Sequence, residues 1–261
     1  MIRIEKIMSL LETEYVGREI HYFQKLSSTN TVAKEQAEKG AKEGTTIVAE
    51  VQTQGRGRLS RPWVSPKGGV WLSIILRPKV KAEDALKITL TTAVAVAKTL
   101  RSLYGWKAEI KWPNDVLIRK KKVCGILTEA SLNGKTVNFL VVGIGLNANF
   151  ALKSLSENLQ KTATTLKEVL KKNVDIEKLI CTLLKEFEDC YKLFKEGKFV
   201  KLLSEWCQMA GFLGKKVEIT SFMERWVGKA VDIDENGALI VELENGERKK
   251  VLSGDVTIQG A

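Results

Sequence analysis

The 261-residue sequence contains one histidine, His21, and only four cysteines: Cys124, Cys181, Cys190 and Cys207. No two of these cysteines form a Cys-x-x-Cys pair, so the clustered ligand set of a structural zinc site is missing. Free cysteines are usually buried and reduced, which is the state we expect here. The lone histidine argues against a Ser-His-Asp or Cys-His nucleophile system, and we expect it near a strand edge.

The sequence also lacks an apolar run of about 18 residues, which a membrane-spanning helix requires. Residues 1–17 place acidic side chains among the apolar ones and contain no small-residue cleavage pattern, unlike a secretory signal. We therefore expect a cytoplasmic protein that does not contact a membrane. The length is sufficient for one large domain and one small one.

Positive charge is in excess, with 42 lysines and arginines against 31 acidic residues and a net charge of +11. Such a field attracts acidic proteins, nucleotides or nucleic acid and speeds encounter, but it does not determine a fold.

Hydrophobic periodicity predicts an α+β fold in two parts. Residues 1–212 are expected to form a catalytic domain with a mixed, mainly antiparallel sheet packed against helices. Its helices are expected at 3–13, from about 30 to 40, 82–103, 163–170, 176–194 and 198–209. Its strands are expected at 20–23, 45–51, 70–76, 108–111, 116–118, 123–130 and 137–146, with a charged hairpin tip at 120–122.

The texture changes near Gly214, where short strands alternate with Asn-Gly turns. We expect strands at 216–220, 226–233, 239–243 and 247–252. Residues 213–261 are therefore predicted to form a small C-terminal β-barrel.

The loop between the strands expected at 45–51 and 70–76 is basic and rich in glycine. It contains Gly55, Arg56, Gly57, Arg58, Arg61 and Trp63. Glycines let the backbone approach a ligand, and arginine forks bind carboxylates and phosphates. Trp63 offers a flat face on which a base could stack. A small anionic ligand is favoured, while a loop that grips a nucleic-acid backbone stays open from this segment alone.

Three further segments are candidates for the same site: KWPND at 111–115, KVCGIL at 122–127 and GIGLNAN at 143–149. Each has a purely structural alternative. Lys122 could be one more hairpin charge, Asn147 a turn former, and the SSTN run at 27–30 a helix N-cap. The glycine pairs match neither a dinucleotide-binding fingerprint nor a Walker loop.

Taken together and in this order, SSTN, GRGRLSRPW, SPKGGVWLSIILRP, KWPNDVL, KVCGIL and GIGLNAN resemble the biotin–protein ligase (biotin–[acetyl-CoA-carboxylase] ligase) family. The resemblance covers nearly the whole chain from about Ser27. It implies a class II synthetase-like, biotin–lipoate ligase-like catalytic fold and an SH3-like C-terminal barrel. It also implies an enzyme that makes biotinyl-5′-AMP from biotin and ATP with Mg²⁺. Such an enzyme then transfers biotin to one lysine of a biotin carboxyl carrier protein.

The resemblance implies a role for each matched residue. Biotin contacts are implied for Ser28, Thr29, Gln52, Gly55, Arg56, Arg58, Lys122 and Gly125. ATP contacts are implied for Arg58, Arg61, Trp63, Lys111, Asn114, Lys122 and Asn147, with Trp63 stacking on adenine. The resemblance implies that Lys122, Arg56 and Lys111 are the catalytic cations, which agrees with the chemistry, because attack of a carboxylate on a phosphate brings two anions together. No metal ligand is assigned.

The sequence departs from the family pattern at two places. The loop reads Leu59-Ser60 where many members have Arg-Gly, a change that bears on loop closure and adenylate retention in a direction the sequence leaves open. Cys124 stands where a small residue is usual. About 25 residues precede the SSTN run, too few for the winged helix-turn-helix of larger members, so operator-specific DNA binding is not expected.

Two other functions compete with this interpretation. A lipoate–protein ligase has related chemistry, but its usual arginine-serine-glycine-glycine run is absent. A non-catalytic nucleic-acid-binding protein would use the basic loop and the terminal barrel, and would bind random DNA with steep salt dependence. Family members occur as monomers or homodimers, so a homodimer stays open.

Overall fold

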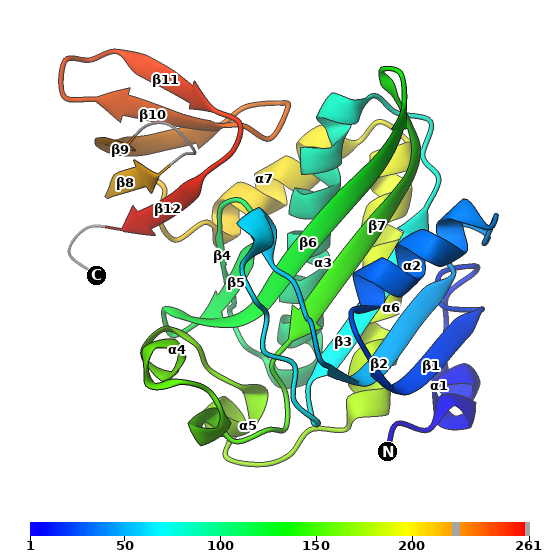
Figure 1. The fold of residues 1–261 in the computed structure, drawn as a ribbon. Helices are drawn as coiled ribbons and strands as arrows, with labels where there is room; N and C mark the ends of the chain where they lie inside the picture. The colour runs from blue at the N-terminus through cyan, green and yellow to red at the C-terminus, as the bar shows by residue number, and fades with distance from the viewer. Residues whose placement is uncertain (221–224, 259–261) are drawn as a thin grey trace.

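A mixed seven-stranded sheet forms the centre of the molecule (Figure 1), of which the computed structural model describes residues 1–220 and 225–258. Its strand order is β1-β2-β3-β7-β6-β5-β4. The strands are β1 Ile20–Leu26, β2 Thr46–Gln52, β3 Val70–Leu76, β4 Glu109–Lys111, β5 Asp115–Ile118, β6 Lys121–Asn133 and β7 Thr136–Leu146. Only β1 and β2 pair in parallel. The predicted α+β class with a mainly antiparallel sheet is confirmed.

Helices cover both faces of this sheet. They are α1 Ile4–Leu10, α2 Thr29–Glu38, α3 Ala85–Tyr104, α4 Glu157–Thr162, α5 Leu166–Leu170, α6 Ile176–Lys195 and α7 Phe199–Met209. Helix α3 packs on one face and is itself covered by α6 and α7, while α2 packs on β2 and β3 from the other face. Because both faces are covered, every residue of β3 is buried, which explains its continuous apolar sequence.

The segment that joins α1 to β1 is fixed by a buried carboxylate on α6. Glu188 accepts hydrogen bonds from the backbone N–H groups of Glu14, Tyr15 and Val16 at 2.8–3.0 Å. Burial alone would raise the pKa of Glu188, but these donors and Lys192 outweigh it and hold that pKa below its ordinary value. This charge is therefore satisfied by fixed backbone donors.

A second, five-stranded antiparallel sheet follows α7, as predicted for a small SH3-like β-domain. Its strands are β8 Lys216–Thr220, β9 Arg225–Ile233, β10 Leu239–Leu243, β11 Arg248–Val251 and β12 Asp255–Ile258. The predicted second domain, 213–261, includes residues 221–224 and 259–261, which lie outside the described part. Strand β12 was not predicted, since four residues carry too little alternation to be recognised.

Two local predictions were wrong. The charged hairpin tip does not lie at 120–122, because Arg119 and Lys120 form the turn with φ values of 51° and 62° and β6 begins at Lys121. Lys122 therefore projects from a strand. The helix predicted at 163–170 begins only at Leu166, and a separate helix, α4, precedes it.

The structure also tests what was expected of the cysteines, the single histidine and membrane-spanning segments. Cys124, Cys181 and Cys190 are buried and Cys207 is half-buried, and all four are free, as predicted. His21 lies on β1 at the edge of the sheet, 3.0 Å from Glu19. Among the described residues, no helix is both long enough and apolar enough to cross a bilayer.

Candidate active site

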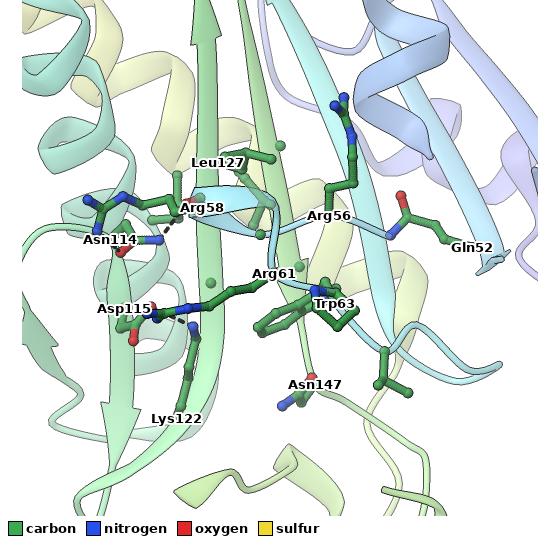
Figure 2. A pocket seen from close by; sticks show the side chains of 18 of the residues that line it. Gln52, Arg56, Arg58, Arg61, Trp63, Asn114, Asp115, Lys122, Leu127 and Asn147 are labelled. Carbon is green, nitrogen blue, oxygen red and sulfur yellow. Dashed lines mark hydrogen bonds and ion pairs between the residues drawn. The ribbon is translucent and has the colours of Figure 1, made fainter. Parts of the chain in front are cut away.

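A cavity of about 240 Å³ lies over β6 and β7, between the arginine-rich loop and the N-terminal end of α2 (Figure 2). It brings together most of the residues that the sequence singles out. Of these, Ser28, Thr29, Gln52, Arg56, Arg58, Arg61, Trp63, Asn114, Lys122, Gly125 and Asn147 line the cavity. Residues from distant parts of the chain, including Asp255 of β12, complete its wall.

One end of the cavity is neutral and polar. The backbone N–H of Thr29 donates to Gln52 Oε1 at 2.8 Å, and Gln52 Nε2 donates to Ser65 Oγ at 2.8 Å. Ser28 occupies the N-cap position of α2, but its hydroxyl makes no capping hydrogen bond. The SSTN run thus supplies the N-cap residue by position, without a side-chain cap, and Ser28 also lines the cavity.

The floor of the cavity is made of glycines on adjacent strands. Gly125 of β6 pairs in register with Gly145 of β7. A Cβ at Gly145 would lie 2.5 Å from Trp63 Nε1, and one at Gly125 would lie 3.0 Å from the Trp63 ring. These glycines thus allow the indole to rest on the sheet. Gly143 and Gly145, within the GIGLNAN segment, were not among the predicted site residues, although glycines within a strand indicate a close approach.

Trp63 is half-buried by this floor rather than exposed. Its indole N–H is buried and has no hydrogen-bond partner among the described residues. Lys122 Nζ lies 4.9 Å from the centroid of the ring, a cation–π distance. The indole, its unpaired N–H and the ammonium group therefore lie close together in the cavity wall.

Lys122 is held between this ring and a carboxylate. Its Nζ lies 2.6 Å from Oδ1 of Asp115, which begins β5 directly after the KWPN bend. The neighbouring Asn114 uses Nδ2 to donate to the carbonyl oxygen of Ile126 at 2.8 Å. The bend is thereby fixed to β6, with Asp115 and Lys122 facing each other (Figure 2).

Arg56 lines the rim of the cavity and extends toward α2 (Figure 2). Its Nη2 lies 3.2 Å from both carboxylate oxygens of Glu129 and 3.5 Å from the Thr31 hydroxyl. The side chain is 45% exposed. The Arg56 guanidinium is therefore paired with the Glu129 carboxylate at the rim of the cavity. Another anion can replace this carboxylate.

The other two loop arginines contact the C-terminal domain. Arg61 Nη1 lies 2.5 Å from Asp255 Oδ2, and Arg58 Nη1 lies 3.6 Å from Asp255 Oδ1. Arg58 also donates to the carbonyl oxygen of Gly254 at 3.1 Å and to Asn114 Oδ1 at 3.3 Å. Asp255 was missed because no local signal in the sequence reports a partner almost 200 residues away.

Burial and charge act against each other at Arg58. Burial is the larger effect and holds the pKa of its guanidinium below the ordinary value, while the nearby Asp255 and Asp115 carboxylates partly offset it. Both acids thus support a cation that is largely removed from water.

Two predicted site residues lie outside the cavity. Lys111 lines a neighbouring cleft, which shares Arg61, Asn114 and Asp255 with the cavity. Gly55 has no room for a Cβ because the Trp63 carbonyl is too close, and its own carbonyl accepts the Trp63 N–H at 2.8 Å. Gly55 therefore allows the two sides of the loop to approach each other at Trp63.

Asn147 and the Leu59-Ser60 pair also have defined structural roles. Asn147 Nδ2 donates to the carbonyl oxygen of Thr164 at 3.0 Å, which ties the end of β7 to the segment before α5. Leu59 and Ser60 have φ values of 53° and 58°. This left-handed region favours glycine, so the loop carries strain at the position where the family often has Gly.

The arrangement can accept a ligand with a neutral polar head and an anionic end. The head would lie at Ser28, Thr29 and Gln52, where the groups are uncharged hydrogen-bonding partners. Anionic groups would lie near Lys122 and the loop arginines, which stabilise negative charge.

Comparison with known proteins gives a consistent result. The Biotin/lipoate A/B protein ligase family matches residues 22–147, and the Biotin protein ligase C terminal domain matches residues 212–258. The bifunctional ligase/repressor BirA of Bacillus subtilis is 37% identical over 249 residues, which are 95% of this chain and 76% of that protein. The biotin--[acetyl-CoA-carboxylase] ligase of Paracoccus denitrificans is 32% identical over 200 residues, 75% of this chain and 82% of that one.

A solved structure extends the comparison to the fold. Biotin protein ligase from Aquifex aeolicus in complex with biotin and ATP superposes with a TM-score of 0.81 and 31% identity. The match covers 94% of this chain and all of that one.

Proposed function

The chain belongs to the biotin protein ligase family, and we propose that it activates biotin with ATP and attaches it to a lysine of a biotin carboxyl carrier protein. One observation carries the proposal: a single cavity joins a neutral hydrogen-bonding end to a cluster of lysine and arginine side chains. The neutral end suits a ureido ring, and the cationic end suits a carboxylate and phosphates.

In the first step, a carboxylate oxygen of biotin attacks the α-phosphorus of ATP. The bond to the bridging oxygen breaks, pyrophosphate leaves, and biotinyl-5′-AMP remains. Lys122 offsets the repulsion between the two anions and stabilises the charge that develops on the α-phosphate. It must exchange Asp115 for the phosphate, and this exchange keeps the ammonium paired throughout.

The remainder of the nucleotide would occupy the loop side of the cavity. Trp63 offers its ring to adenine, and Asn147 lies beside it at the end of β7. Arg58 and Arg61 would exchange Asp255 for phosphate oxygens. Lys111 lines the neighbouring cleft, and its positive charge would attract the departing pyrophosphate.

Magnesium would be bound together with the nucleotide. The described residues contain no group of three or more His, Cys, Asp or Glu side chains that could hold a metal ion. Mg²⁺ usually takes one or two carboxylates and completes its shell with phosphates and water. Asp115 and Asp255, which both line the cavity, fit that requirement. When bound, the ion would neutralise phosphate charge and favour loss of pyrophosphate.

In the second step, the carrier lysine attacks the acyl carbon of the mixed anhydride. An amide bond forms, AMP leaves, and the amine loses a proton. The cavity lining contains no histidine, so catalysis rests largely on positioning. The net charge of +11 suits an acidic carrier protein and ATP.

The test measures pyrophosphate release with ATP, Mg²⁺ and either biotin or lipoate, and identifies the bound acyl-adenylate by mass spectrometry. Biotin-dependent release with biotinyl-AMP on the protein is the expected result. Release with lipoate alone would assign the chain to the lipoate branch of its family. If folded protein releases no pyrophosphate with either acid, the proposal is overturned.

A separate experiment tests the transfer step. Purified carrier domain is added to protein that holds biotinyl-AMP, and its mass is measured. We expect a gain of one biotinyl group on a lysine. An unmodified carrier in the presence of intact adenylate would contradict the second half of the proposal.

A further inference from the structure

A buried polar chain runs from Thr29 into the sheet; Thr29 and Asn30 line the cavity, and Ser73 lies beneath them. Thr29 Oγ1 lies 2.7 Å from Ser73 Oγ, which in turn lies 2.6 Å from Asn30 Oδ1. Asn30 Nδ2 donates to Glu129 Oε2 at 2.7 Å and to the carbonyl oxygen of Leu127 at 3.2 Å. Ser73 is fully buried, and Thr29 and Asn30 are each 4% exposed.

The orientation of the Asn30 amide is determined by its neighbours. A carboxylate and a carbonyl can only accept hydrogen bonds, so the NH₂ group of Asn30 must face Glu129 and Leu127. The amide oxygen then faces Ser73 and can only accept. The hydroxyl of Ser73 is the one group placed to donate to it.

The number of hydroxyl protons limits the direction in which the Thr29 hydroxyl can donate. Its hydroxyl oxygen has two polar neighbours, Ser73 Oγ at 2.7 Å and Gln52 Oε1 at 3.0 Å. Together with the contact between Ser73 and Asn30, there are three short oxygen–oxygen contacts but only two hydroxyl protons. Because the Ser73 proton points to Asn30, the Thr29 proton has two acceptors within the protein, Ser73 Oγ and Gln52 Oε1, and when it makes either contact only a lone pair is left for the cavity.

We propose that Ser73 and Asn30 are positioning residues that determine ligand specificity, because they commit the Thr29 hydroxyl to act as an acceptor toward the cavity. Thr29 then selects a ligand that presents an N–H group. The inference rests on the proposed function: the ureido ring of biotin carries two N–H groups, whereas the dithiolane ring of lipoate carries none. A buried acceptor that meets another acceptor is left unpaired, which is a strong basis for rejection.

The surrounding strands leave space for this arrangement. Gly143 of β7 faces the Asn30 side chain, and a Cβ there would overlap the amide oxygen. Glycine at this position thus lets the amide approach the sheet closely enough to reach Ser73 and Leu127.

The test compares biotin with two isomeric cyclic carbamates, in each of which one ureido N–H is replaced by a ring oxygen. Dissociation constants are measured calorimetrically without ATP, so that binding is separated from chemistry. The native protein should reject the isomer whose ring oxygen faces Thr29 by about 30-fold or more relative to biotin.

Ser73→Ala removes the nearer of the two acceptors of the Thr29 proton, at 2.7 Å, and leaves Gln52 Oε1 at 3.0 Å, which already accepts the Thr29 backbone N–H, so the proton is held less firmly. Thr29 can then donate to the carbamate oxygen. The preference for biotin over that isomer should fall about tenfold. For the other isomer, the ratio of its dissociation constant to that of biotin should be the same in the native protein and in Ser73→Ala. A purely structural defect would weaken all three ligands together and leave the ratios unchanged.

Thr99→Val is the matched control, since it also removes a buried hydroxyl, which bonds to the Ala95 carbonyl within α3. It should leave the ratios as in the native protein. If Ser73→Ala does not fold, Ser73→Cys, whose thiol is a weak donor, should shift the same ratio in the same direction.

The outcomes are distinguishable. Unchanged ratios in a folded Ser73 variant that still activates biotin would overturn this inference and leave the proposed function intact. Failure of the native protein to bind biotin at all would overturn both.

Discussion

The two sides of the cavity are built on different principles. On the α2 side, Thr29, Asn30, Ser73 and Gln52 are uncharged and are linked through short hydrogen bonds, and the two sides meet at Glu129, which accepts from Asn30 and pairs with Arg56. The loop side instead carries cations, each of which is paired with a carboxylate from another part of the chain. These pairs are Arg56 with Glu129, Arg58 and Arg61 with Asp255, and Lys122 with Asp115.

This difference indicates which side is rigid and which can exchange partners. Breaking a buried neutral hydrogen bond leaves a group unpaired at a cost of about 1–3 kcal/mol. A partly exposed ion pair, such as that of Arg56 or Arg61, contributes only about 0–1 kcal/mol. Arg58 and Lys122 are more buried, and a phosphate can replace their carboxylates because it brings the same negative charge. The α2 side is therefore suited to recognition, and the loop side to binding and releasing charged groups during a reaction.

The largest effect should come from Lys122→Ala on the charged side. We expect adenylate formation to slow by about 10²–10³-fold, since a cation that stabilises developing charge on phosphate is lost. The fold should persist, because Lys122 lies at the cavity rather than in the core. Pyrophosphate release and thermal unfolding measure the two effects.

Lys121→Ala is the control, because the neighbouring Lys121 side chain is exposed and its Nζ donates to the Gln160 carbonyl oxygen at 3.3 Å. It should retain near-native activity. Native-like pyrophosphate release from Lys122→Ala would remove this residue from the mechanism.

Two glycines on β7 allow the two sides to be perturbed separately. A Cβ at Gly143 would overlap the Asn30 amide, whereas one at Gly145 would meet Trp63. We expect Gly143→Ala to weaken biotin binding by about 10- to 100-fold while ATP binding changes little, because a buried network is displaced. Gly145→Ala should instead weaken ATP binding more than biotin binding.

Calorimetric titration of both variants with both ligands gives the comparison. Equal losses for both ligands in both variants would show that the cavity responds as one unit and would contradict the division into two sides.

The sequence predicted the elements whose pattern is strong. Strands at 70–76, 216–220 and 239–243 match to the residue, because a continuous or alternating apolar run bounded by turn residues is distinctive. Helix α4, with the sequence ENLQKT, was missed because it has no buried residue and therefore no apolar periodicity. The misplaced hairpin tip arose because Arg119 and Lys120 adopt left-handed conformations that lysine and arginine rarely take.

The candidate site was predictable to the extent that it consists of local motifs. The structure brings the SSTN, GRGR, KWPND and GIGLNAN segments to one cavity, although the roles of the individual residues stay predictions. The partners of those residues could not be predicted. Asp255, Glu129 and Ser73 lie in ordinary strand sequences, and their importance arises only when the sheet and the C-terminal domain bring them beside Arg61, Arg56 and Asn30.

A smaller effect is expected from Arg56→Gly at the rim. Loss of one charged hydrogen-bonding group should speed the release of biotinyl-AMP by about tenfold. The midpoint of thermal unfolding should change little, because the ion pair with Glu129 is partly exposed.

Release is measured by filter retention of labelled adenylate. Arg3→Gly serves as the control, since Arg3 is exposed and pairs with Glu177 far from the cavity. Unchanged retention in Arg56→Gly would argue against a role of this arginine in holding the adenylate.

The smallest expected effect is that of salt, and it distinguishes the two sides without mutation. Raising the salt concentration from about 0.05 M to about 0.5 M shortens the Debye length several-fold and weakens partly exposed charge interactions. The affinity for ATP should then fall about three- to tenfold, because its phosphates contact Lys122 and the loop arginines. Biotinamide, which keeps the ureido ring but has no carboxylate, depends on the uncharged α2 side, so its affinity should change by less than about twofold. Equal salt dependence for both ligands would mean that charge contributes to recognition throughout the cavity, and the contrast between its two sides would have to be abandoned.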